Sequence, residues 1–221
     1  MSLTEVESQH DYSPENRTVE IKYEATSTVL LGDITAFMRL LTSCFEAANK
    51  QLRKAQIQKL LVSCDWIEHY RDKSSGKRVL AESTTLEYKH ELYTAIALTK
   101  VNYEVVFAPK GMFKRGDKKF DVFLIREHAI LKADLKYITS KNPNTIANRI
   151  KEGCDQASRV VIDIASDISI RDLIDGLRSG VFRNKLLQQI LLFYKGGFYI
   201  LNRGIIESKH IYGLIARKGF Q

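Results

Sequence analysis

Two aspartates and a lysine stand in two consecutive apolar segments of the chain. Asp121 lies in a β-branched and aromatic run, and Asp134 and Lys136 lie in the next run, separated from each other by one leucine. Residues two apart in a β-strand point to the same face of a sheet. If the two segments pair as a hairpin through the turn at 126–128, Asp121 lies near Asp134, with Lys136 just deeper.

This set of side chains has a chemical use. Two neighbouring carboxylates repel each other and stay ionised only when a divalent cation or a positive side chain lies between them. Mg²⁺ is commonly held by one or two carboxylates together with water and substrate phosphate, and Mn²⁺ or Zn²⁺ is an alternative ion. Lys136 could activate a water or contact a phosphate during attack on phosphorus. The predicted reaction is hydrolysis of a phosphodiester bond.

The order Asp121, then Asp134-x-Lys136, resembles the signature of the PD-(D/E)XK nuclease superfamily, with Phe120 where that family often has proline. The resemblance implies an α/β fold (α+β) of the restriction-endonuclease type, with a central mixed β-sheet flanked by helices. It also implies a divalent-metal-dependent nuclease in which Asp121 and Asp134 are metal ligands.

A larger part of the chain, roughly residues 80–205, is similar to the C-terminal tRNA nuclease domains of contact-dependent growth inhibition toxins of the CdiA type. The likeness rests on a helix with Glu91, a strand at 102–107, the Asp-x-Lys strand, a helix with Gln156 near its end and a strand at 159–164. This resemblance implies that the substrate is RNA, especially tRNA, and that a cognate immunity protein is a partner. It places the site of action in the cytoplasm and leaves the delivery route open.

A helix is expected over about 79–100, where Glu91, Ala95 and Leu98 lie on one stripe at spacings of four and three residues. Glu87 lies one turn earlier on this stripe and is the competing candidate. The resemblance favours Glu91 as a metal ligand or as a residue that orients the lysine. The alternative is an exposed acidic residue with no role in the site.

Several basic and polar residues are candidates for contact with the substrate. The loop 109–119 contains two glycines and precedes Asp121 directly, so it could grip a phosphate backbone or be a solvated hairpin tip. Arg149 and Gln156 lie seven residues apart on one helical face. The resemblance suggests that Gln156 hydrogen-bonds the substrate or the lysine, with a surface glutamine as the alternative. The candidate substrate-binding residues are Lys110, Lys114, Arg115, Lys118, Arg149 and Gln156.

Two domains are expected in this chain of 221 residues, 44% of which are apolar. Residues 1–75 are predicted as a smaller, mainly helical accessory domain with one long amphipathic helix from Ile34 to Ala55. The polar segment 71–78 is a linker or long turn, and 79–221 forms the nuclease-like domain.

Composition excludes several classes of protein. No apolar run approaches the roughly 18–20 residues of a membrane span, and the polar N-terminus is unlike a signal peptide, so a cytoplasmic protein is expected. Three widely spaced cysteines support neither a disulfide framework nor a zinc motif. The net charge of +8 suits a polyanionic partner such as nucleic acid. Neither a P-loop nor a Rossmann fingerprint is present.

Two alternatives to the RNA nuclease remain. One is a DNA endonuclease of a mobile element or defence system, and the other is a non-catalytic nucleic-acid-binding module that retains the fold. The distinguishing feature is whether Asp121, Asp134 and Lys136 converge at a site open to a basic surface. A Lys136 side chain buried in a structural ion pair would favour the binding module.

Overall fold

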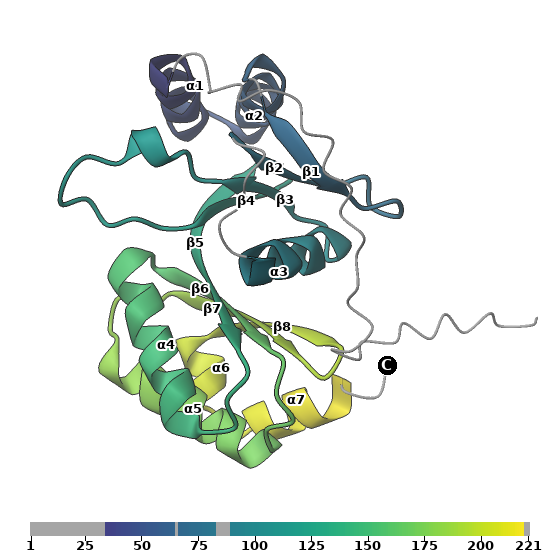
Figure 1. Ribbon diagram of the computed structural model, residues 1–221, viewed down its shortest axis with the longest axis vertical. Helices are drawn as coiled ribbons and strands as arrows, with labels where there is room; N and C mark the ends of the chain where they lie inside the picture. Colours follow the sequence, from purple (N-terminus) through teal and green to yellow (C-terminus); the bar gives the residue numbers. More distant parts are fainter. Residues whose placement is uncertain (1–33, 65, 83–88, 219–221) are drawn as a thin grey trace, which may run out of the picture.

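The computed structural model describes residues 34–64, 66–82 and 89–218, so the candidate Glu87 lies outside the described residues. These residues form an α/β fold around one eight-stranded mixed sheet in which the strands follow their order in the chain (Figure 1). The fold class predicted from the sequence is confirmed. The strands are β1 (Ile67–Arg71), β2 (Arg78–Ala81), β3 (Glu104–Phe107), β4 (Val122–Arg126), β5 (Ala129–Ile138), β6 (Arg159–Ile164), β7 (Gln189–Tyr194) and β8 (Gly197–Asn202).

Hairpins and helical crossovers set the relative directions of strands β4 to β8. Hairpins join β4 to β5 and β7 to β8, and these pairs are antiparallel. Helical crossovers join β5 to β6 and β6 to β7, and these pairs are parallel, as a crossover connection requires. The helices are α1 (Ile34–Glu46), α2 (Lys50–Ser63), α3 (Lys89–Lys100), α4 (Pro143–Gln156), α5 (Ile170–Arg183), α6 (Arg203–Glu207) and α7 (Ile211–Lys218), with a short 3-10 helix η2 (Lys110–Met112).

Helices cover both faces of the sheet. Helix α3 packs on one face, in a cluster with Leu124, Leu135 and Val161. On the other face, α1 and α2 share a cluster with Phe123, while α4 to α7 share a cluster with Ile162. Because neighbouring residues of a strand point to opposite faces, each strand supplies both layers. The cluster with Ile162 includes Cys154 near the end of α4, and the cluster with Phe123 includes Ala157 directly after this helix.

The helix expected over 34–55 is two helices, and this prediction was wrong in its continuity. Helix α1 ends at Glu46, and α2 begins after Asn49, whose side-chain oxygen accepts a hydrogen bond from Leu52 N at 2.9 Å. An asparagine in extended conformation that satisfies a free helical N–H is an N-cap, so it favours a new helix start over continuation. Periodicity alone does not detect this break, since α2 keeps a similar spacing of apolar residues.

The helix expected over 79–100 begins later than predicted. Residues 78–81 form β2, which pairs antiparallel with β1 and parallel with β3, and Val79, Leu80 and Ala81 are buried. The backbone N–H and C=O groups of this buried segment form hydrogen bonds with the neighbouring strands. In so short an apolar run, the spacing of apolar residues does not distinguish a strand from a helix. The polar segment at 72–77 is the turn between β1 and β2.

Turns fix the two hairpins as their sequences indicate. Glu127 has a φ of 54° in the turn from β4 to β5. Lys195 and Gly196 have φ values of 46° and 76° between β7 and β8. Positive φ at both central residues is the conformation that matches the twist of a two-residue hairpin, and glycine adopts it without steric cost. The Lys195-Gly196-Gly197 sequence suits this turn.

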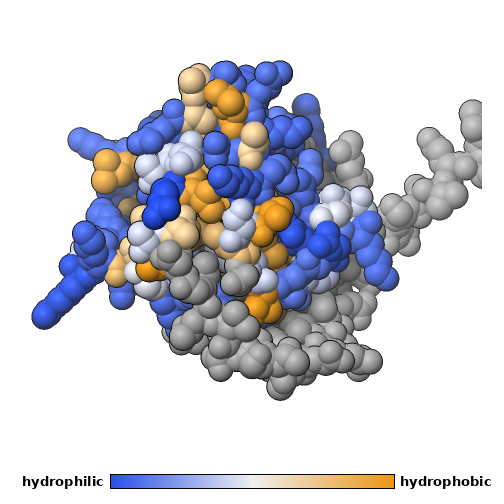
Figure 2. Space-filling view, turned by 90° about the horizontal axis from the view of Figure 1, so that it is seen from above, coloured by the Kyte–Doolittle hydropathy of each residue, from blue (hydrophilic) through white to orange (hydrophobic). Residues whose placement is uncertain are grey.

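The outer face of α1 and α2 carries separate apolar side chains. Figure 2, which views the molecule from the end where these helices lie, shows hydrophobic patches scattered among hydrophilic side chains. The exposed large hydrophobic residues of these helices are Met38, Phe45, Leu52 and Val62. In the part of the chain that the structure describes, no helix has the length and apolar character to cross a bilayer. All three cysteines are free thiols, and Cys44 and Cys154 are buried.

Candidate active site

The register of the β4–β5 hairpin brings Asp121 and Asp134 together. Val122 pairs with Ala133, so Asp121, one residue before β4, lies across from Asp134. The ladder continues at this point, because Asp121 N donates to Ala133 O at 3.2 Å. Asp121 Oδ2 also accepts from Leu135 N at 2.7 Å, which fixes its carboxylate beside β5. The predicted proximity of the two aspartates is confirmed.

Lys136 forms an ion pair with Asp134. Its Nζ lies 2.5 Å from Asp134 Oδ2, and the side chains are 15% and 0% exposed, respectively. Asp134 Oδ2 is thus buried against the Lys136 ammonium group. Lys136 and Asp134 share a face of β5 with the end of α4, while Leu135 packs in the α3 layer, as the alternation predicted.

Gln156, the last residue of α4, completes the surroundings of Asp134. Its side-chain amide, with the nitrogen assigned toward two acceptors, donates to Asp134 Oδ1 at 3.0 Å and to the carbonyl oxygen of Lys119. Gln156 therefore links the carboxylate to the loop that precedes Asp121. The sequence placed Gln156 near the site, but it did not indicate Asp134 as its partner.

Burial and charge set the ionisation of Asp134. The pKa of this carboxyl group is raised to about 7, chiefly because burial removes it from water and secondly because Asp121 is negatively charged, while the ion pair with Lys136 lowers it. The ionised form is thus only partly stabilised by the protein. A second positive charge between Asp121 and Asp134 would favour ionisation.

Glu91 lies apart from this group. It is in the first turn of α3, the helix that packs on the opposite face of the sheet from Asp134 and Lys136. Within the described ranges, no three or more His, Cys, Asp or Glu side chains are grouped to hold a metal ion. The structure therefore brings the two aspartates together without Glu91. The spacing of Glu91, Ala95 and Leu98 predicts one face of a helix, but it does not say which face of the sheet that helix covers.

The loop between β3 and β4 carries exposed basic side chains and leads directly into Asp121. This loop projects from the sheet in Figure 1 and carries η2. Lys110, Lys114, Arg115 and Lys118 are exposed on it, and its last part reaches Gln156 through Lys119 O. Arg149 is exposed on α4 and pairs with Glu152 at 2.7 Å. The loop is thus positioned beside the carboxylates, and its role in phosphate contact stays a prediction.

Close approach of α4 to the sheet depends on Gly153. A Cβ atom at this position would lie 2.8 Å from Val160 Cγ2 and 3.1 Å from Asp134 Oδ2. Gly153→Ala is expected to lower the free energy of unfolding by roughly 1–3 kcal/mol because the helix must shift outward. Urea denaturation measures this. Gly213→Ala is the matched control, since a Cβ atom there meets nothing within 4 Å and alanine favours the helix. Equal stability of the two variants would contradict the close packing.

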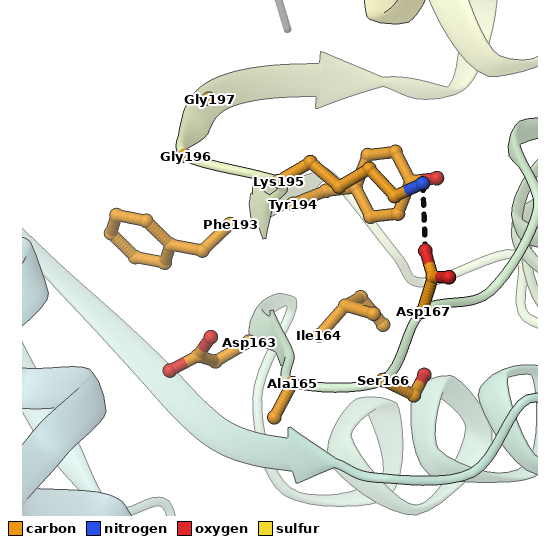
Figure 3. Close-up of a pocket in the computed structure, with 10 residues that line it drawn as sticks. All are labelled: Asp163, Ile164, Ala165, Ser166, Asp167, Phe193, Tyr194, Lys195, Gly196 and Gly197. Atoms are coloured by element: carbon orange, nitrogen blue, oxygen red, sulfur yellow. Dashed lines mark ion pairs between the residues drawn. The ribbon is translucent and has the colours of Figure 1, made fainter. Parts of the chain in front are cut away.

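A pocket of about 230 Å³ lies at the other end of the parallel strands (Figure 3). Asp163, the β6–α5 loop and the β7–β8 turn line it, and Lys195 Nζ pairs with Asp167 Oδ1 at 2.8 Å at this site. Asp134 pairs with Val160 and Ile138 with Ile164, so four residues, about 13 Å of strand, separate the two places. The pocket is distinct from the aspartate pair.

Asp163 points to the opposite face from Asp134. Its Oδ2 accepts from Thr94 Oγ1 of α3 at 3.2 Å, and the side chain is fully buried. Alternation along β6 gives this opposite orientation, and the hydrogen bond to Thr94 joins β6 to α3. Two backbone groups at the main site, Leu135 N and Lys119 O, were missed because every residue carries an amide and a carbonyl and the sequence gives no sign of which are used.

Comparison with known proteins gives one match. The family model described as "Contact-dependent growth inhibition CdiA C-terminal domain" matches residues 123–198. That segment contains Asp134, Lys136 and Gln156, and Asp121 lies two residues before it. No curated protein and no solved structure matches the chain. The family match supports a relationship between residues 123–198 and the CdiA-type toxin domains.

Proposed function

We propose that this protein is a divalent-metal-dependent endonuclease that hydrolyses phosphodiester bonds of RNA, with tRNA as the substrate, in the manner of a CdiA-type toxin domain. The observation that carries the proposal is the pair of aspartates facing each other across β4 and β5, with Lys136 on Asp134. The family match over residues 123–198 supports a toxin nuclease in general. The net charge of +8 suits a polyanionic substrate.

The residues fit a hard divalent cation such as Mg²⁺. The Asp134 side chain is fully buried, and burial together with the neighbouring Asp121 raises the pKa of its carboxyl group, so a cation between the two aspartates would stabilise their ionised forms. Proteins commonly bind Mg²⁺ through one or two carboxylate ligands, with water and substrate phosphate as the other ligands. Asp121 and Asp134 would hold the ion. When bound, it would neutralise charge that develops on the phosphate in the transition state.

Each protein group has a role in this proposal. Asp121 and Asp134 orient the reacting phosphate, and Leu135 N and Gln156 keep the two carboxylates in place through their hydrogen bonds. Lys136 contacts the phosphate or positions the attacking water with its ammonium group. Lys110, Lys114, Arg115, Lys118 and Arg149 attract the backbone of the substrate. Glu91, on the helix that covers the opposite face of the sheet, does not hold the ion in this proposal.

The wider assignments follow from the same proposal. The order Asp121, Asp134-x-Lys136 on two adjacent strands agrees with the PD-(D/E)XK arrangement. A cognate immunity protein is the proposed partner, and the cytoplasm of a target cell is the proposed site of action. Residues 1–75 and 79–221 as two domains remain a prediction; α1 and α2 share a hydrophobic cluster with Phe123 of the sheet.

One observation favours a second function, a nucleic-acid-binding module without cleavage. Lys136 is mostly buried and already neutralises Asp134 at 2.5 Å. In this alternative the ion pair is structural, and the basic loop alone binds nucleic acid. The two functions differ in a single readout, which is whether bound nucleic acid is cut.

The test is cleavage of labelled total tRNA and of plasmid DNA by the wild type and by Asp134→Ala, each with Mg²⁺, Mn²⁺ and EDTA. Metal-dependent cleavage of tRNA, reduced by roughly 10²-fold or more in the variant, is expected because a metal ligand is removed. Asp175→Ala, an exposed aspartate on α5, is the control and should cleave like the wild type.

The other outcomes are equally informative. Cleavage of plasmid DNA alone would replace RNA by DNA as the substrate. Binding of both polymers without cleavage, with an affinity that falls steeply with salt, would overturn the nuclease and support the binding module. Circular dichroism of each variant checks that it is folded.

A further inference from the structure

An exposed aromatic side chain with basic neighbours lies at the end of α5. Phe182 is 82% exposed and Leu186 is 70% exposed, and the exposed basic residues Arg183 and Lys185 lie beside them. The sequence analysis of substrate contacts did not include this segment. Phe182 falls outside the apolar stripe of α5, whose buried members include Leu177 and Val181. An aromatic ring in such a position is not part of the core.

The segment is held in a defined conformation. Val181 and Leu187 on either side are buried at 0% and 5% exposure. Arg203 Nη2 donates to the carbonyl oxygens of Val181 and Asn184, both at 2.9 Å, which satisfies free carbonyls at the end of α5. The exposed Phe182 ring is therefore presented by an ordered helix end, and it faces water at a cost in free energy.

This segment lies at the same end of the molecule as Asp134. Gln188 N donates to Ser158 O at 2.8 Å, directly after the last residue of α4, Gln156. Val160 pairs with both Asp134 and Ile190, so the start of β7 is two strand spacings, about 10 Å, from the aspartate.

The neighbouring helices agree with this position. Helices α4 and α5 run in the same direction, because Gly176 contacts Ile146 and Gly180 contacts Ile150. Their C-terminal ends, with Gln156 and Phe182, therefore lie at one edge of the fold. The basic loop 109–119 reaches the same edge through Lys119 O.

We infer that Phe182 is a stacking site for an unpaired base of the RNA substrate, with Arg183 and Lys185 contacting the adjoining phosphates. An exposed aromatic ring flanked by cations is the combination that binds single-stranded nucleic acid, since every base offers a π-face and every linkage a negative charge. An RNA strand then passes from the basic loop, over the aspartates, to Phe182. The inference rests on the proposed function and adds a preference for unpaired nucleotides near the cut.

The test uses the full chain in EDTA, so that binding is measured without cleavage. The probe is a 12-nucleotide single-stranded RNA with a 5′ fluorescein, followed by anisotropy. Phe182→Ala is expected to raise Kd by roughly 5- to 150-fold, the range for loss of one stacked base. Phe182→Trp, which keeps a π-face, should bind within about threefold of the wild type.

The matched control is Tyr212→Ala. Tyr212 is also an exposed aromatic residue, at 56%, and it lies against the first half of α5, near Arg171 and Ile174. Its removal should change Kd by less than about twofold, because the residue lies at the other end of the helix. A 12-base-pair RNA duplex should be bound equally by the wild type and Phe182→Ala, because its bases are already stacked. A 2-aminopurine base in the probe should be quenched by the wild type only.

The outcomes separate the inference from the proposed function. Wild type that cleaves RNA, with Phe182→Ala binding the single strand equally well, would overturn the stacking site alone. An equal loss of duplex binding would also overturn it. A wild type that neither binds nor cleaves RNA would overturn both. Self-association of the wild type that Phe182→Ala abolishes, seen by sedimentation without RNA, would make this surface a contact between copies and overturn the inference.

Discussion

Replacing Lys136 by methionine is expected to lower the rate of phosphodiester cleavage by roughly 10²–10³-fold, while RNA affinity changes by less than about threefold. The ammonium group lies 2.5 Å from Asp134 and beside Asp121, where the reacting phosphate would be held. Its charge there acts on the transition state more than on the bound substrate, whereas the exposed basic residues supply affinity. Single-turnover cleavage and anisotropy in EDTA measure the two quantities separately.

Lys132→Met is the control for this prediction. Lys132 lies on β5 two residues before Asp134 and on the same face, but it is exposed and its Nζ lies over the Phe120 ring at 5.3 Å. Its loss should change the cleavage rate by less than about threefold, since it is not paired with either aspartate. If the two substitutions lowered the cleavage rate equally, Lys136 would act only as one of several basic residues that attract the RNA. An unchanged rate in Lys136→Met would remove it from the mechanism.

The second large effect concerns stability. Asp134→Asn is expected to raise the free energy of unfolding at pH 8 in EDTA, by an amount whose upper limit is roughly 4 kcal/mol. The folded-state pKa of Asp134 is raised from 3.8 to about 7 because the carboxyl group is buried beside Asp121. Asparagine resembles the protonated form that the folded protein prefers, and its oxygen still accepts from Gln156.

The sign of the pH dependence follows from linkage. Between pH 4 and 7 the folded protein retains a proton on Asp134 that the unfolded chain has lost, so wild-type stability falls as pH rises through this window. Below pH 4 both states are protonated, and the difference between wild type and Asp134→Asn should shrink. Urea denaturation at pH 4, 6 and 8 measures it. The exposed Asp175→Asn should follow the wild type at each pH.

A double variant checks the physical cause. Lys136→Met alone removes the charge that lowers the pKa of Asp134, so at pH 8 this carboxyl group either stays ionised without its ion pair or takes up a proton; breaking one side of a buried pair costs up to roughly 3–5 kcal/mol. Lys136→Met with Asp134→Asn removes both charges and should recover most of that loss without recovering cleavage. If the double variant is as unstable as Lys136→Met, the packing of the lysine stem rather than its charge stabilises this part of the fold.

Much of the site was accessible from the sequence because it depends on local rules. Alternation along a strand places Asp134 and Lys136 on one face. A short turn between two β-branched runs gives an antiparallel hairpin, and the register then sets Asp121 opposite Asp134. The turn between β7 and β8 likewise depends on a few consecutive residues, Lys195-Gly196-Gly197. Each of these results needs only a few consecutive residues.

The remaining errors lie where local patterns are ambiguous. The break between α1 and α2 depends on one cap, Asn49, within a continuing apolar period. Residues 78–81 became a strand because β1 and β3 supply partners on both sides. The pattern of apolar residues over one helix length predicts neither the conformation of Asn49 nor the strands that pair with 78–81.

The sequence by itself determined the D-x-K strand, its hairpin partner and the mixed α/β class, since periods of two and about 3.6 residues and turn chemistry act over short distances. Only the tertiary structure decided that α3 carries Glu91 on the opposite face of the sheet and that Gln156 donates to Asp134. It also decided that Phe182 lies at the same edge of the fold as the aspartate pair. The reason is that the layer a helix joins, and the end at which it stops, are set by packing between residues far apart in the chain.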